Sequence, residues 1–252
     1  MKKNSKIKTL IQKMGPLLAL LILVIIFCVI MPDKFPKVGN IMNVLKQASI
    51  NCLISAGMLC ALITAGIDLS VGSNCVLCTC LIGVLVQKAG ITNPVILILC
   101  GLAISTFCGF LNGTLLTRLD LPHPFVSTMG MKNVLLGVAL VITGSKSIAF
   151  TGAGVVCVGR LATANANSGA TYDNDAIAAC IVGGASFTGG KGTIWGTLVG
   201  ALLMAVIRNG LNLMGAQNDI QYIVVGGVII VAVTIDVMRN KMEAKARKMA
   251  AQ

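Results

Sequence analysis

Long uncharged apolar runs are the feature that most restricts how this chain folds. Four of them occupy residues 14–32, 47–67, 69–87 and 89–117, and charged residues bound each one. About 20 apolar residues cross a bilayer as an α-helix, so each run is long enough to span a membrane. Only 11% of the 252 residues are charged, against roughly 25% in soluble proteins. A soluble globular fold is therefore excluded.

The second half of the chain predicts further, less regular membrane segments. Pro122 and Pro124 are expected to hold the chain out of a helix, so that a shorter, broken fifth span follows at residues 133–145. Residues 148–172 are rich in small and polar side chains and predict an exterior loop with weak helix.

A short apolar segment then precedes two more spans. Residues 176–190 are too few for an ordinary span and predict a re-entrant or broken helix. Ordinary spans are expected at residues 193–214 and 220–237. The predicted fold is all-α, a polytopic transmembrane helical bundle with about 6 to 8 spans, in a single domain over residues 1–252.

The net charge of +12 is concentrated at the two ends of the chain. Half of the 20 basic residues lie within residues 2–13 and 239–248. Basic clusters beside apolar spans follow the positive-inside rule, so both termini are expected in the cytoplasm, with an even number of crossings between them. No base-stacking aromatic pattern accompanies the charge, so nucleic-acid binding is not expected.

The cysteines and the single histidine lack the neighbouring residues that a metal site or a catalytic site requires. The Cys75, Cys78, Cys80 cluster has no second pair or histidine nearby, which favours packing over a metal site. His123 lies between two prolines without a catalytic partner at recognisable spacing. We therefore predict no catalytic, cofactor-binding or metal residues, and no enzyme activity.

A glycine-rich segment around Lys191 invites comparison with a phosphate loop. Ala185 stands where Walker A has its first glycine, and Gly192 stands where it has the serine or threonine hydroxyl. Nucleotide binding is not expected from these residues. Any ATP hydrolysis would come from a separate subunit.

Polar residues within the apolar runs are the candidates for function. Asp68 interrupts two runs between Gly66 and Gly72, which allow the helix to break. Asp68 has two interpretations, a structural cap for the next helix or a group that lines a substrate pathway. The candidate pathway residues, chosen by the same reasoning, are Asp68, Asn112, Thr128 and Asn209.

Glycines mark the expected helix breaks and close packing. Gly196 and Gly200 form a G-x-x-x-G step that lets another helix approach closely. Gly189, Gly190 and Gly192 are expected to interrupt the chain between the short segment and the next span.

Three stretches resemble the permeases of ribose, xylose and related carbohydrate ABC importers. They are GIDLSVGS at residues 66–73, LNGTLLTRLDLPHPFVSTMGM at 111–131, and the long stretch at 172–215 that contains D-A-I-A-A, G-G-x-S and N-G-L-N-L. The resemblance implies a plasma-membrane pore subunit for a ribose-like sugar. It also implies three kinds of partner: a second permease copy in a homodimer, an ABC ATPase subunit and an extracellular sugar-binding protein.

The chain departs from the family pattern in its middle. Residues 1–152 resemble the N-terminal part of the family and residues 155–252 the C-terminal part. The block that normally separates them, with the cytoplasmic loop that docks into the ATPase, is expected to be absent. The alternative function is therefore a non-transporting remnant or a membrane interaction protein, with an autonomous secondary carrier as a further possibility.

Overall fold

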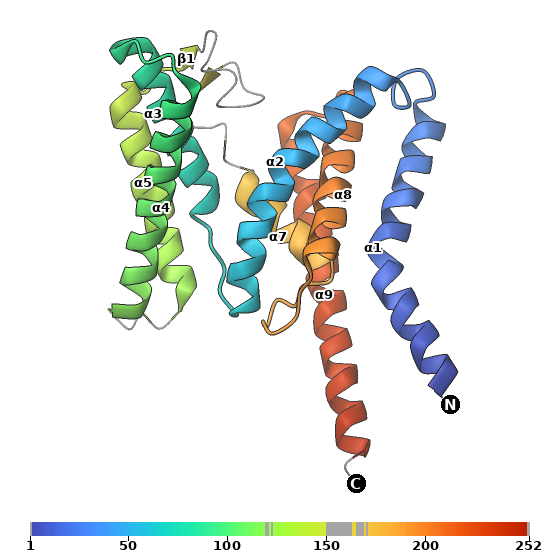
Figure 1. The fold of residues 1–252 in the computed structure, drawn as a ribbon. Coiled ribbons are helices and arrows are strands. Elements are labelled where there is room, and N and C mark those ends of the chain that lie inside the picture. Colours follow the sequence, from blue (N-terminus) through green and yellow to red (C-terminus); the bar gives the residue numbers. More distant parts are fainter. Residues whose placement is uncertain are drawn as a thin grey trace. The chain divides into compact units, whose positions relative to one another are not determined.

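The computed structural model of the chain describes residues 2–118, 121, 123–149, 163–164, 169 and 171–250. It forms two compact units. Unit 1 contains Met1–Ala65 and Asn174–Gln252, and unit 2 contains Gly66–Asp173. Every long element is a helix (Figure 1), which confirms the expected all-α fold.

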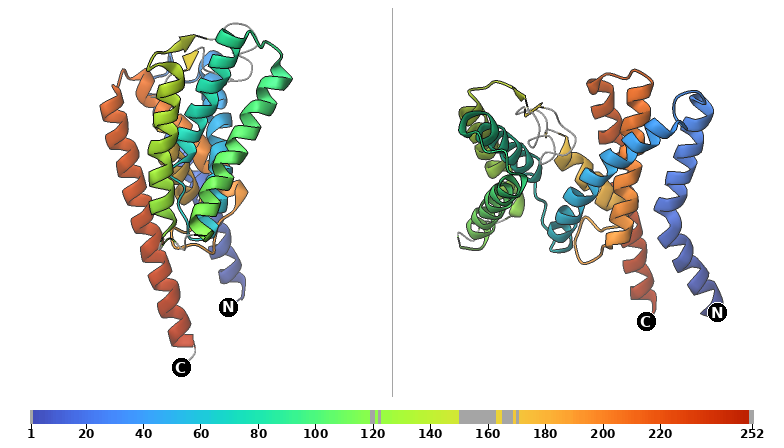
Figure 2. Two further views of the ribbon diagram at one scale, coloured as in Figure 1. Left: turned by 90° about the vertical axis from the view of Figure 1, so that its left-hand side faces the viewer. Right: turned by 45° about the horizontal axis from the view of Figure 1, so that its top comes forward.

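Unit 1 is built around one helix, α8. Its helices are α1 (Lys2–Ile30), α2 (Val38–Ile63), most of α7 (Tyr172–Val182), α8 (Ile194–Leu213) and α9 (Asn218–Ala250). Both α1 and α2 pack along α8. Ala201, Met204 and Ala205 of α8 are fully buried in the core of this unit. The start of α1 and the end of α9 lie at the same end of unit 1 (Figures 1 and 2).

Small residues let α7 meet α8 backbone to backbone. A Cβ atom on Gly200 would lie 2.0 Å from the carbonyl oxygen of Ala179, and one on Gly196 would lie 2.0 Å from that of Gly183. No side chain fits at such distances, so glycine at these two positions sets how closely the helices approach. The close approach occurs at the G-x-x-x-G step of α8.

Unit 2 is a three-helix bundle followed by a short ladder. Its helices are α3 (Val71–Ala89), α4 (Pro94–Arg118) and α5 (Pro124–Thr143), and they lie side by side in Figure 2. Both α4 and α5 pack against α3. Strands β1 (Ile148–Ala149) and β2 (Thr163–Ala164) pair antiparallel, with Ile148 opposite Ala164. The exterior loop expected at residues 148–172 otherwise lies largely outside the described residues.

The prediction of a broken fifth span at residues 133–145 is wrong. The helix α5 starts at Pro124 and is a continuous helix of 20 residues. Proline is favourable at the first position of a helix because no hydrogen bond is required of its nitrogen there. The Nδ1 atom of His123 accepts a hydrogen bond of 3.2 Å from the Phe125 amide and so caps this start.

Three other helices are longer than the uncharged runs predict. The helix α1 begins at Lys2 rather than at residue 14, α2 begins at Val38 rather than at residue 47, and α9 continues to Ala250 rather than ending at residue 237. Lysine and arginine are good helix formers, so a charged residue ends an apolar run without ending the helix.

Six helices in the described part of the chain are long and apolar enough to cross a membrane. They are α2, α3, α4, α5, α8 and the part of α9 from Asn218 to Met242. The helix α1 adds a shorter apolar segment, Met14–Ile30. Much of α4 is exposed, including Phe107 and Phe110, which suits a surface against lipid. The polytopic bundle of 6 to 8 spans is confirmed, and the chain is a multi-pass membrane protein.

The contact between α7 and α8 predicts a large difference between two glycine substitutions in unit 1. Gly200→Leu must push α8 away from Ala179, and we expect a loss of at least about 3 kcal/mol of unfolding free energy. Gly226→Ala in α9 meets no atom within 4 Å, so it should leave stability unchanged or slightly raised. Thermal unfolding of the detergent-solubilised protein measures both. Equal melting temperatures for the two variants would contradict the packing.

Candidate functional site

The break between α2 and α3 carries the first polar side chains of the site. Residues 64–70 have no regular helix, and α3 resumes at Val71. The Asp68 Oδ1 atom accepts hydrogen bonds from the Ser70 amide at 2.8 Å and from the Ser70 hydroxyl at 2.6 Å. Asp68 thus fixes the turn that leads into α3, although it does not bond to the amides inside that helix.

Helices α4 and α5 continue this polar group into a chain of hydrogen bonds. The Ser127 hydroxyl of α5 donates to the Asn112 side-chain oxygen on α4. The Asn112 amide group donates to the Ser70 hydroxyl at 3.4 Å, and that hydroxyl donates to Asp68. Ser70, Asn112 and Ser127 are buried. We call these four residues the unit 2 relay.

Thr128 satisfies the backbone at the break from α5. Its hydroxyl donates to the carbonyl oxygen of Ile67 at 3.0 Å, and it lies 3.3 Å from the carbonyl oxygen of Phe125 in its own helix. A carbonyl that leaves a helix inside a membrane needs such a donor, because no water is present to supply one. The structure therefore brings three of the four sequence candidates, Asp68, Asn112 and Thr128, to one helix break.

An ion pair between the partly exposed Lys132 and the buried Asp173 lies one helical turn from Thr128. The Lys132 ammonium contacts the Asp173 Oδ2 atom at 2.5 Å, and only 1% of the Asp173 side chain is exposed. Asp173 Oδ1 has no hydrogen-bond partner among the described residues. Gly72 makes room for it, since a Cβ there would lie 2.8 Å from that oxygen. Asp173 is a functional candidate that the sequence reasoning did not single out.

Unit 1 holds a second ion pair. Arg208 of α8 donates two hydrogen bonds to the Asp175 carboxylate, from Nε at 2.5 Å and from Nη2 at 2.7 Å. A third contact joins the Arg208 Nη1 atom to the Gln221 side-chain oxygen at 3.4 Å. Gln221 in turn donates to the Asn212 side chain at 2.7 Å. The pair and its neighbours connect α7, α8 and α9.

The fourth sequence candidate, Asn209, belongs to unit 1. Its amide group donates to the Asn40 side chain at 2.9 Å. Asn40 donates to the Phe35 carbonyl oxygen, so the two asparagines help to close the turn before α2. The Asn209 Oδ1 atom is buried without a partner among the described residues.

The glycines that were expected at helix breaks occupy two irregular segments. Gly66 is buried in the segment before α3 and Gly72 lies in the first turn of that helix. Gly189 and Gly190 both have positive φ, at 84° and 75°. The Gly190 amide donates to the Ile63 carbonyl oxygen at 2.9 Å, and Gly192 packs against Leu59 of α2.

The sequence carried a signal for both ion pairs. Lys132 and Arg208 are each the only charged residue inside an apolar segment, and Asp173 and Asp175 precede the short apolar segment of α7. A charge inside a membrane segment is costly without a partner, so isolated opposite charges are expected to pair. Which lysine or arginine meets which aspartate depended on the folded helices.

The site offers hydroxyl, amide and carboxylate groups at a helix break within an apolar bundle. Such groups can exchange hydrogen bonds with the hydroxyl groups of a neutral polar solute. Among the described residues no three His, Cys, Asp or Glu side chains converge to hold a metal.

Comparison with known proteins identifies the family. The family model described as the permease component of branched-chain amino acid transport systems matches residues 40–152 and, a second time, 147–233. These matches cover more than half of the chain. The chain belongs to this permease family. The resemblance to ribose-type permeases inferred from the sequence motifs is also confirmed, because the similar curated proteins include sugar permeases.

Three relatives illustrate the likeness. The ribose import permease protein of Bacillus subtilis is 31% identical over an alignment of 302 positions. That alignment covers 89% of this permease and 92% of the relative. The fructose import permease protein of Rhizobium meliloti is 26% identical, with coverage of 94% and 91%. The D-allose transport system permease protein of Escherichia coli is 28% identical, with coverage of 91% and 93%. No solved structure matches the chain significantly.

The Arg208 and Asp175 pair predicts non-additive losses of stability. Arg208→Leu or Asp175→Leu leaves one buried charge without its partner, so each should cost about 3–5 kcal/mol. The double variant removes both charges and should cost clearly less than the sum of the two single losses. Chemical unfolding in detergent, monitored by circular dichroism, measures the cycle. Additive losses would show that the two side chains do not interact.

Proposed function

We propose that this permease is the membrane-spanning subunit of an ATP-driven importer for a ribose-like monosaccharide. The single observation that carries the proposal is the unit 2 relay, a buried set of polar groups at a helix break in a family of sugar permeases. Relatives named as ribose, fructose and D-allose permeases support the substrate class. The permease itself is proposed to bind and pass the sugar, with hydrolysis on another subunit.

The unit 2 relay suits the passage of a sugar, because a sugar hydroxyl can replace one of its hydrogen-bond partners without leaving a polar group unpaired. A sugar hydroxyl both donates and accepts, so it can replace Ser70 as the partner of Asn112 or of Asp68. The candidate pathway residues in unit 2 are Asp68, Asn112 and Thr128. Asn209 is proposed as a separate pathway position in unit 1, where its buried oxygen, which has no partner among the described residues, could accept from a sugar hydroxyl.

The proposed assembly contains two permease copies, an ATPase and an extracellular sugar-binding protein. The basic clusters at residues 2–13 and 239–248 support a cytoplasmic location for both termini. Their common end in unit 1 agrees with that arrangement. The plasma membrane is the proposed location, since a binding protein outside the cell must reach the permease.

We also propose that the chain lacks an internal block that its relatives carry. Two observations support this: the family model matches twice with an overlap at residues 147–152, and the alignment to the Bacillus protein spans 302 positions for a chain of 252 residues. Residues 1–152 and 155–252 would then correspond to the two flanking parts. If the block held the ATPase docking loop, a non-transporting remnant is the rival function.

Reconstitution distinguishes the two functions. The permease is expressed with its ATPase and binding protein, purified, and placed in proteoliposomes that contain or lack ATP. We expect a stable complex and ATP-dependent uptake of labelled ribose or a related pentose. A permease that inserts but neither retains the ATPase nor takes up sugar would establish the remnant. Uptake without any ATPase would instead indicate a secondary carrier.

Two matched threonines test the position of the pathway. Thr128→Val removes the donor to Ile67 and should lower sugar uptake by roughly tenfold, about the effect of one lost buried hydrogen bond. Thr114→Val is the control, because that exposed hydroxyl bonds only to Phe110 of its own helix. Equal initial uptake rates for the two variants at equal protein levels would count against Thr128.

Alanine substitution of all the candidates together tests the whole set. A variant with alanine at Asp68, Asn112, Thr128 and Asn209 should bind the ATPase but lose sugar uptake. Co-purification reports the assembly, and proteoliposome uptake reports the pathway. If uptake by the assembled variant equals that of the original protein, these residues do not line the route.

A further inference from the structure

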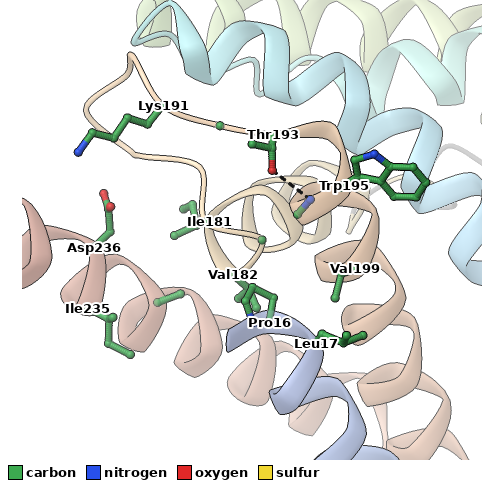
Figure 3. Close-up of a pocket in the computed structure, with 15 residues that line it drawn as sticks. Pro16, Leu17, Ile181, Val182, Lys191, Thr193, Trp195, Val199, Ile235 and Asp236 are labelled. Atoms are coloured by element: carbon green, nitrogen blue, oxygen red, sulfur yellow. Dashed lines mark hydrogen bonds between the residues drawn. The ribbon is translucent and has the colours of Figure 1, made fainter. Parts of the chain in front are cut away.

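A pocket in unit 1 has a lining that includes none of the residues assigned to sugar passage. Its cavity volume is about 560 Å³, and it is bounded by the middle of α1, the end of α7, the start of α8 and the middle of α9. Figure 3 shows its apolar side chains, among them Leu17, Val182, Val199 and Ile235. Lys191 and Asp236 lie at one end of this pocket.

The pocket is at the depth where apolar spans meet charged flanks. Leu17 is near the start of the apolar segment Met14–Ile30, and Asp236 is near the end of the apolar part of α9. Trp195, the only tryptophan of the chain, lines the pocket and is 80% exposed. Tryptophan is enriched at membrane–water interfaces, because its ring is apolar and its N–H is polar. The positions of Leu17, Asp236 and Trp195 all indicate that the pocket lies at the membrane–water interface.

The charges at the polar end have opposite signs and are held by the fold. Asp236 Oδ2 accepts hydrogen bonds from the Ser186 hydroxyl and the Phe187 amide, each at 3.1 Å, and from Asn240 at 3.2 Å. Among the described residues, all three of these bonds fall on the same carboxylate oxygen. Lys191 belongs to the same glycine-rich segment that Ser186 anchors, which keeps the two charges at the same end.

We propose that this pocket binds a phospholipid whose headgroup carries both a phosphate and a primary ammonium, as phosphatidylethanolamine does. The Lys191 ammonium takes the phosphate, and the Asp236 carboxylate accepts hydrogen bonds from the lipid ammonium. An acyl chain lies along the apolar wall. An anionic lipid without an ammonium is disfavoured by Asp236. A choline headgroup is disfavoured because its methylated nitrogen has no N–H to donate.

The single tryptophan provides the measurement. The purified full-length permease is titrated in mixed micelles with brominated-chain phosphatidylethanolamine, phosphatidylcholine or phosphatidylglycerol, and quenching of Trp195 fluorescence is followed. We expect phosphatidylethanolamine to reach half-maximal quenching at roughly tenfold lower mole fraction than the other two, the effect of one charge-assisted hydrogen bond. Equal quenching curves for the three lipids would overturn the proposal.

Three variants separate a specific site from general lipid contact. Lys191→Gln should abolish the preference for phosphatidylethanolamine, and Ala232→Phe should do so by filling the pocket from α9. Lys241→Gln is the matched control, because it removes an exposed positive charge from α9 outside the pocket lining. Thermal unfolding of each variant confirms that it is folded. Identical effects of Lys191→Gln and Lys241→Gln would overturn the proposal.

Two competitors test the nature of the occupant. Soluble phosphoethanolamine has the headgroup without acyl chains, and we expect it to compete only at far higher concentration. Equally tight competition would show a headgroup site and overturn the lipid assignment. Purified ATPase subunit should leave the lipid quenching unchanged. If it displaces the lipid from Trp195, the pocket is a subunit interface instead.

Discussion

Inside a bilayer no water is available to satisfy a polar group, and this constraint determines most of the structure. Continuous helices satisfy the backbone internally. Where the chain leaves a helix, other segments supply the missing bonds. Thr128 donates to the Ile67 carbonyl oxygen at the break before α3. The Gly190 amide donates to the Ile63 carbonyl oxygen at the end of α2. These backbone groups outside the helices therefore have hydrogen-bond partners within the protein.

The same constraint explains why the buried charges occur in pairs. A lone aspartate in the core of either unit would carry a desolvation cost of several kcal/mol. Arg208 offsets this cost for Asp175 with two planar contacts, and Lys132 does so for Asp173. The Arg208 pair is also directional, because a planar guanidinium meets both oxygens of the carboxylate, so it restricts how α8 is oriented against α7.

Function in this permease follows from where the pairing is incomplete or exchangeable. The unit 2 relay is made of neutral hydroxyl and amide groups that end on one carboxylate, so a sugar hydroxyl can enter it without leaving a charge unpaired. The pocket lined by Lys191 and Asp236 instead carries charged groups, which suits the charged lipid headgroup that we propose for it.

The sequence by itself determined the all-α membrane fold, because uncharged runs of span length have few other stable structures. It also located the helix break at Asp68 and the glycines of α8, since charge and missing side chains are visible in the sequence. Helix ends were predicted less accurately than helix positions. The helix α5 starts at Pro124 with a cap from His123, whereas the two prolines had suggested that no helix forms there. Lys46 likewise ended an apolar run without ending α2.

Only the tertiary structure decided which polar groups meet. Ser70, Asn112 and Ser127 are far apart in the sequence, and no spacing rule relates them. The sequence did not identify Asp173 as a site residue, because its ion-pair partner Lys132 and the neighbouring Gly72 lie on different helices. A charged residue in an apolar segment predicts that a partner of opposite charge exists. Which residue becomes that partner depends on how the helices pack, and that packing depends on contacts over the whole unit.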